Sequence, residues 1–93
     1  MIETTRGEAG AKRRVCLYGR PDCHLCDEAR AGLDAMLADG LPFELEEVNI
    51  ESDEELHARF LERIPVVELD GVIVSELWLD VDGLRARLDT LSA

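Results

Sequence analysis

The chain alternates between short apolar runs and stretches whose apolar residues recur at helical spacing. Residues 15–18 form an apolar run that ends at Gly19, which predicts a buried strand. From about Cys23 the apolar residues recur every three or four positions until Gly40 and Pro42 stop the pattern. This spacing predicts a helix, and its buried face would carry Leu25, Ala29, Leu33, Met36 and Leu37.

Residues 43–50 predict a second strand, followed by a second helix. Apolar and acidic residues alternate along this strand, and the alternation shifts by one position after Glu46, so we expect a bulge there. Residues 52–55 have the spacing of a capping box, which predicts that the helix begins here. The buried stripe of this helix would consist of Leu56, Phe60, Leu61 and Ile64.

The last third of the chain predicts a hairpin and a final helix. Asp70-Gly71 joins the apolar runs 66–69 and 72–74, as a two-residue hairpin turn does. Asp80 can cap a last helix, whose buried face would carry Val81, Leu84, Leu88 and Leu91. The order β-α-β-α-β-β-α predicts an α/β fold with a four-stranded mixed sheet flanked by helices. Its first two strands would be parallel and its last two antiparallel.

The length and the charge of the chain limit the number of its domains and the class of its partners. The 93 residues allow one domain, which we place at residues 15–93 behind a flexible lead of residues 1–14 without periodicity. The lead holds four basic and two acidic side chains, so the rest of the chain carries −13 while the whole chain carries −11. A domain with this much negative charge repels the phosphate backbone of nucleic acids, so we do not expect a nucleic acid as a partner.

The sequence also predicts the compartment. No apolar stretch approaches the roughly 20 residues of a membrane span, and the first residues lack the apolar segment of a signal peptide. We therefore expect a cytoplasmic protein without a membrane partner, and we expect it to be a monomer. Thiols are kept reduced in the cytoplasm, so its three cysteines are not expected to form a structural disulfide framework.

Cys23 and Cys26 lie three positions apart where a strand and a turn lead into a helix. Unpaired N–H groups and the helix dipole stabilise a thiolate at such a helix start, which predicts that Cys23 is the nucleophile. Cys26, almost one turn further on, can then resolve a mixed disulfide. Arg20 and a protonated His24 would lower the pKa of the Cys23 thiol, whereas nearby carboxylates would raise it. A thiolate that is stabilised only moderately makes the dithiol a better reductant. We therefore expect the protein to reduce disulfides rather than to form them.

Residues 17–26, which read Leu-Tyr-Gly-Arg-Pro-Asp-Cys-His-Leu-Cys, resemble the active-site segment of glutaredoxins. They resemble still more closely the glutaredoxin-like small bacterial proteins with a Cys-His-Leu-Cys centre. The resemblance covers about residues 15–91 and implies a thioredoxin fold. It also implies a thiol–disulfide oxidoreductase with a part in cell redox homeostasis and electron transport.

The resemblance further implies which residues form the site. Pro65 matches the family's cis-proline before the third strand, and the backbone of Ile64 would pair with the bound thiol substrate. Arg20 matches a basic residue three positions before the first cysteine. The expected site thus has two catalytic and four substrate-binding residues: Cys23 and Cys26, and Arg20, His24, Ile64 and Pro65.

No bound cofactor is expected, because an external thiol reductant would restore the dithiol. Glutaredoxins hold glutathione with a Gly-Gly pair followed closely by Asp, whereas this chain has residues 75–80, Ser-Glu-Leu-Trp-Leu-Asp, at that place. Glutathione, another low-molecular-weight thiol and a protein reductase therefore all stay open as electron donors. The substrates would be protein disulfides or disulfides of small thiols.

Two other functions use the same residues. The cysteines could ligate a metal or an iron–sulfur cluster. A structural zinc site, however, has four ligands, and a cluster bridged between subunits requires two chains. A redox-sensing interaction domain is the other alternative, and turnover would separate it from an enzyme. Cys16 is interpreted as a buried hydrophobic residue of the first strand. We expect Trp78 to pack against the last helix, with a place on the substrate surface as the alternative.

Overall fold

The computed structural model describes residues 13–92, with side chains as far as Asp89. Its strands lie in the order β2-β1-β3-β4, in which β1 and β2 are parallel and the other neighbours are antiparallel. The predicted mixed sheet and the predicted order of elements are both confirmed. The elements are β1 (Arg13–Gly19), α2 (His24–Ala38), β2 (Phe43–Asn49), the 3-10 helix η1 (Ile50–Ser52), α3 (Glu54–Phe60), β3 (Val66–Leu69), β4 (Val72–Glu76) and α4 (Val81–Ser92).

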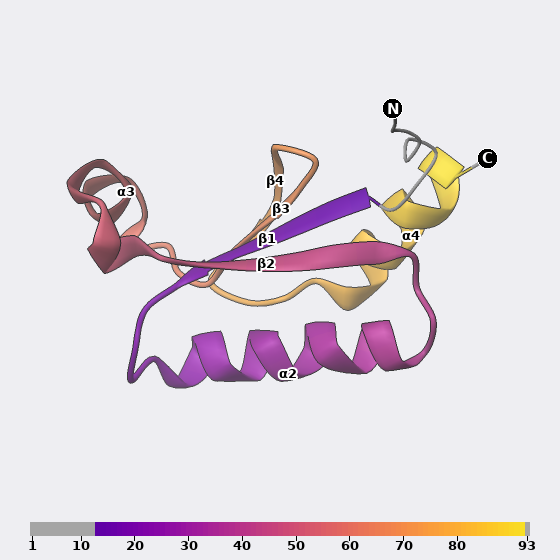
Figure 1. Ribbon diagram of the computed structural model, residues 1–93, viewed down its shortest axis with the longest axis horizontal. Coiled ribbons are helices and arrows are strands. Elements are labelled where there is room, and N and C mark those ends of the chain that lie inside the picture. The colour runs from indigo at the N-terminus through magenta and orange to yellow at the C-terminus, as the bar shows by residue number, and fades with distance from the viewer. Residues whose placement is uncertain (1–12, 93) are drawn as a thin grey trace, which may run out of the picture.

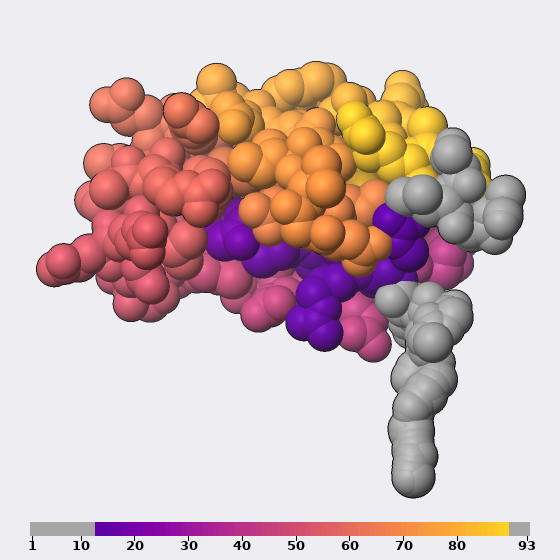
Figure 2. All heavy atoms as spheres, turned by 90° about the horizontal axis from the view of Figure 1, so that it is seen from above, coloured from indigo at the N-terminus to yellow at the C-terminus, as the bar shows by residue number. Residues whose placement is uncertain are grey.

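Helices cover both faces of the sheet (Figure 1). On one face, α2 and α4 enclose the larger core cluster, in which Leu33, Leu84 and Val15 are fully buried. On the other face, η1 and α3 enclose a smaller cluster with Ile50 and Phe60. Figure 2 shows the β3–β4 hairpin on the surface between α3 and α4. Within the described range, none of the helices has the length and hydropathy to cross a membrane.

The strand β1 begins two residues earlier than predicted, because its first residues are tied to the hairpin turn. Asp70 accepts a hydrogen bond from the Arg14 amide at 3.0 Å, its own amide donates to Arg14 O at 2.8 Å, and its carboxylate also contacts the Arg13 guanidinium. Asp70 and Gly71 both have positive φ, which suits the expected hairpin turn. The rest of the expected lead, residues 1–12, lies outside the described residues.

The prediction of a bulge in the second strand is wrong. β2 pairs with β1 in unbroken register, and the one irregularity among the described strand pairs lies in β3–β4, between Val67 and Glu68. The shift in the β2 pattern has another cause, because the sheet is covered on both faces. Phe43 faces the α2 side, whereas Ile50 leaves the strand in η1 and packs with α3.

Two apolar residues assigned to helix cores are on the surface instead. Leu25 of α2 and Leu61, just after α3, are 48% and 39% exposed. The helix α3 also begins one residue later than expected, since Asp53 is its cap and accepts hydrogen bonds from two amides. The expected cap of the last helix is confirmed, because the Asp80 carboxylate accepts from the Gly83 amide at 3.0 Å. The side chain of Leu91 is outside the described part.

Candidate active site at the start of helix α2

The Cys23–Cys26 pair sits at the junction of β1 and α2. β1 ends at Gly19, and the loop turns through Asp22, whose φ of 62° lies in the left-handed region. Cys23 is then the cap of α2, and its Sγ accepts a hydrogen bond from the Cys26 amide at 3.2 Å. The helix therefore directs an amide N–H at the sulfur, as a thiolate at a helix start requires.

The two cysteines are joined by a disulfide, with their Cα atoms 5.2 Å apart. Cys26 is 6% exposed and belongs to the smaller core cluster, whereas Cys23 is only partly buried. Cys16 is a free cysteine in β1, and burial raises the pKa of its thiol. A buried thiol with a raised pKa is a poor nucleophile, so the structure agrees with the interpretation of Cys16 as a core residue.

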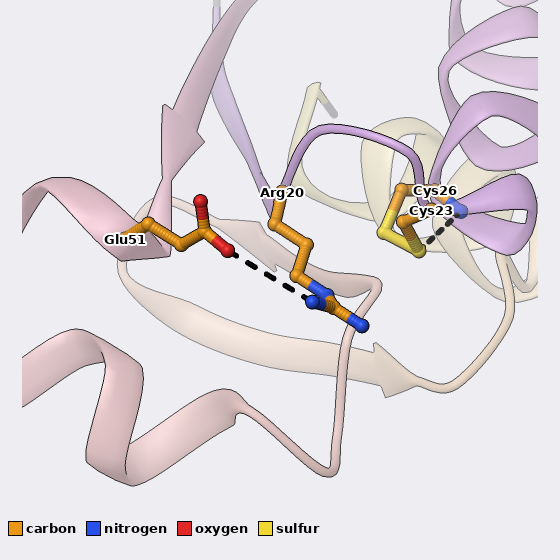
Figure 3. Close-up of a disulfide and its surroundings, with 4 residues drawn as sticks. All are labelled: Arg20, Cys23, Cys26 and Glu51. Atoms are coloured by element: carbon orange, nitrogen blue, oxygen red, sulfur yellow. Dashed lines mark hydrogen bonds and ion pairs between the residues drawn. A yellow bond between two sulfur atoms is a disulfide. The ribbon is translucent and has the colours of Figure 1, made fainter.

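Arg20 lies in the loop between β1 and α2, close to the disulfide (Figure 3). Its guanidinium is 3.8 Å from the carboxylate of Glu51 in η1, and both side chains are about half exposed. Arg20 and Cys26 line the same cavity of about 260 Å³, together with Asp27 and Glu47. Glu51 was missed as a partner of Arg20, because it is distant in sequence and no local pattern connects the two.

Ile64 and Pro65 lie just before β3, and Ile64 brings this segment next to the cysteines. Their peptide bond is cis, and Ile64 packs in the core cluster that contains Cys26. The Ile64 amide donates to Phe60 O at 3.0 Å. Its N–H is therefore already paired, and the substrate pairing expected from the resemblance would fall to its carbonyl oxygen.

His24 is not placed against a cysteine sulfur by any contact of the described chain. Its side chain is 85% exposed, and its Nε2 lies 2.9 Å from the Glu28 carboxylate one helical turn further on. This pair lies on the outer surface of α2 and is the familiar (i, i+4) arrangement of a helix. A role for His24 in tuning the thiolate or binding substrate stays a prediction.

Comparison with protein families decides the relationship. Residues 14–89 match the family described as "Glutaredoxin-like domain (DUF836)", which is most of the chain. The chain belongs to this glutaredoxin-like family. No curated protein sequence matches it closely enough to count as a relative.

Solved structures agree with this assignment. Protein Ne2328 from Nitrosomonas europaea is 30% identical, with a TM-score of 0.73 over 94% of this chain and 98% of its own. Protein XcR50 from X. campestris is 34% identical, with a TM-score of 0.65 over 82% of this chain and 96% of its own. A glutaredoxin from Brucella melitensis is 27% identical, with a TM-score of 0.52 over 86% and 83%. The glutaredoxin-like chain thus has the thioredoxin fold.

An exposed apolar groove beside the cysteine pair of this glutaredoxin-like protein was not predicted from the sequence. Three large apolar side chains, of which Leu25 lies between the two cysteines in the sequence, are exposed: Leu25 by 48%, Leu77 by 54% and Trp78 by 61%. They line a groove between α2 and residues 77–81. Trp78 lines this groove together with Val81 of α4 but is too exposed to be packed into the core against the last helix, and its place on the substrate surface stays a prediction.

The described residues contain no group of three or more His, Cys, Asp or Glu side chains positioned to hold a metal ion. The glutaredoxin-like site therefore offers two sulfur atoms, already bonded to each other, a nearby guanidinium and an apolar groove. These groups are suited to exchanging disulfides with a bound partner.

Proposed function

We propose that this glutaredoxin-like protein reduces disulfides of proteins or small thiols through Cys23 and Cys26. In the first step the Cys23 thiolate attacks one sulfur of the substrate disulfide, forms a mixed disulfide and releases the other half of the substrate as a thiolate. In the second step the Cys26 thiolate attacks the Cys23 sulfur and releases the remaining half. Two electrons pass from the protein to the substrate, and the protein is left with the Cys23–Cys26 disulfide.

The observation that carries this proposal is the unequal placement of two cysteines within bonding distance. Cys23 is the more accessible sulfur and receives the Cys26 amide N–H, so it is the better candidate to meet a substrate. Cys26 is 6% exposed and reaches only what is already attached to Cys23. The order of attack follows from this difference in access.

The return of the protein to the dithiol needs an external reductant. Two equivalents of a low-molecular-weight thiol, glutathione among them, or one dithiol of a reductase protein supply the two electrons by the reverse exchange. Arg20 and the Ile64–Pro65 backbone are the proposed substrate contacts, because both adjoin the cysteine pair. We expect this cycle to run in the reducing cytoplasm, and in a monomer.

The test is a redox titration of the purified protein, with thiol trapping and mass spectrometry to locate each oxidised cysteine. We expect a reversible Cys23–Cys26 bond, a thiol at Cys16 throughout, and a potential between about −280 and −180 mV. Cys23→Ser should abolish the reduction of disulfides. Cys26→Ser should accumulate mixed disulfides at Cys23. Cys16→Ala is the matched control and should retain activity.

Three results would overturn the proposal. Full activity of Cys23→Ser would remove the nucleophile from the mechanism. Visible absorbance of the freshly isolated protein, lost together with Cys23 and Cys26, would instead favour a cluster-binding function for the same cysteines. A protein that is oxidised once but never turns over with any thiol would be a sensor rather than an enzyme.

A further inference from the structure

The apolar groove begins inside the active-site motif. Leu25 stands between the two cysteines of the Cys-His-Leu-Cys sequence and forms one wall. Leu77 stands on the opposite side, and its amide donates to Pro65 O at 2.8 Å and Arg63 O at 3.0 Å. The groove is thus bounded by the cysteine loop and by the residue bonded to the cis-proline segment.

The size and lining of the groove indicate what it can hold. Its volume is about 260 Å³, which is below the roughly 300–1,000 Å³ of sites that enclose a whole small molecule. Gly32 and Leu79 close its floor, and a Cβ at Gly32 would stand 2.6 Å from Leu79 Cδ2. Glu28 is the one charged side chain in the lining. The space therefore suits one or two apolar side chains rather than a charged tripeptide.

The charges around the groove also argue against a charged tripeptide as its ligand. Asp80, which the sequence places where the family's glutathione-holding aspartate would be, accepts the Gly83 amide of α4 with one of its two carboxylate oxygens. The carboxylate of Glu28 lines the groove, that of Glu76 is paired with the Arg63 guanidinium at 3.6 Å, and the chain as a whole carries −11. A thiol with a net negative charge is repelled here, whereas a neutral or basic peptide segment is attracted.

The backbone at Leu77 shows that the exposed side chain is held in place. Its φ of 72° is uncommon for a residue other than glycine and is unfavourable for one with a large side chain. Two carbonyl groups fix its amide in that conformation. Strained residues of this kind are frequent at ligand-binding sites, where the surrounding structure holds them.

We propose that this groove receives an apolar side chain next to the cysteine of a neutral or basic protein segment, whose disulfide is thereby presented to Cys23. The proposal rests on the proposed oxidoreductase function and assigns its substrate class. Trp78, Leu77 and Leu25 are the residues that would recognise the segment.

The test measures a single turnover, so that no reductase has to be known. The pre-reduced protein is mixed with each of two symmetrical peptide disulfides, and release of the peptide thiol is followed by chromatography. Both peptides carry a lysine, and they differ only in the residue beside the cysteine, which is leucine in one and glycine in the other. Glutathione disulfide is the third substrate.

We expect the leucine peptide to react at least about tenfold faster than the glycine peptide, the usual factor for one apolar contact in a pocket. Trp78→Ala should remove most of that preference, and Trp78→Phe should keep it. Val72→Ala is the matched control, since Val72 is also 61% exposed but lies on β4 and does not line the groove. Leu77→Gly relieves the backbone strain, so it should lose the preference without losing thermal stability.

The outcomes separate this proposal from the function on which it rests. Equal rates with both peptides, or a preference unchanged by Trp78→Ala, would overturn the assignment of the groove. The proposed oxidoreductase function would not be affected. A faster reaction with glutathione disulfide than with the leucine peptide would overturn the groove assignment in favour of a small thiol. If none of the three disulfides oxidises Cys23, the proposed function itself fails and the groove assignment falls with it.

Discussion

The replacement of Gly19 by alanine tests whether Cys26 is held tightly by the end of β1. A Cβ at Gly19 would stand 3.0 Å from Cys26 Sγ and 3.1 Å from Cys26 Cβ. Favourable contacts between carbon atoms lie at about 3.5–4.0 Å, so something must move by about half an ångström. Cys26 cannot move away easily, because it is 6% exposed and packs against Phe60 and Ile50, which are buried almost completely.

The cost follows from this crowding. Overpacking a core position by one methyl group costs about 1–3 kcal/mol. The lower entropy of the unfolded alanine chain offsets about 0.4–1 kcal/mol of that. We therefore expect Gly19→Ala to lower the free energy of unfolding by about 1–2 kcal/mol in the disulfide form. For a domain of this size each kcal/mol corresponds to about 4–8 °C in melting temperature.

The cost should depend on the oxidation state. In the disulfide form Cys26 Sγ is bonded to Cys23 and cannot turn away, whereas the free thiol can adopt another rotamer. If the dithiol form is spared about 1 kcal/mol, the reduction potential becomes less negative by about 20 mV. Steric pressure at Gly19 would thus make the disulfide easier to reduce.

Urea unfolding of the oxidised and reduced proteins measures the two costs, and equilibration with a redox buffer followed by thiol trapping measures the potential. Gly40→Ala is the matched control. Gly40 has a φ of 90°, and a Cβ added there would meet no heavy atom within 4 Å, so its strain should be the same in both oxidation states. Equal costs of Gly19→Ala in both forms, or a potential that stays the same or becomes more negative, would refute the reasoning.

Three further predictions concern stability. Asp53→Ala should lower the unfolding free energy by about 1 kcal/mol in urea titrations, because Asp53 caps α3 through the amides of Glu55 and Leu56. The hydrogen bond from the Arg14 amide, with help from Arg13, lowers the pKa of Asp70, so its contribution is present above about pH 4 and is lost as the pH falls through the folded pKa. Unfolding measured across acid pH should therefore be less pH-dependent in Asp70→Asn. Burial, with hydrogen bonds to Cys16 and Glu68, raises the pKa of Tyr18, so stability should decline above about pH 10, where the unfolded chain loses that proton. Tyr18 is the single tyrosine, so tyrosinate absorbance should appear only as the protein unfolds, and Tyr18→Phe should lessen the decline.

Features that depend on neighbouring residues were predictable from the sequence. The hairpin at Asp70-Gly71, the cap at Asp80 and the helix start at the cysteine pair each rest on a few consecutive residues. The element order followed from these signals together with the apolar runs. Such features are local, so the chain around them supplies all the information.

Features that depend on which surface is covered were not predictable. Leu25 has the helical spacing of a core residue, yet it lies in an open groove and is 48% exposed. The phase shift in β2 indicated a bulge only because burial on one face of the sheet was assumed. The pairing of Arg20 with Glu51 arises because β1 and β2 are parallel neighbours and end at the same edge of the sheet. Each of these depends on contacts between distant parts of the chain.

The position of Cys26 links the packing of the protein to its proposed chemistry. It is both the resolving cysteine of the proposed cycle and a member of the core cluster that contains Phe60 and Ile64. A change that alters the fit of this cluster in one oxidation state more than in the other must shift the reduction potential, because the two are thermodynamically linked. Residues that are not among the proposed substrate contacts, Gly19 and Phe60 for example, should therefore tune the potential. The exposed groove residue Trp78, which lies outside that cluster, should alter substrate preference without altering the potential.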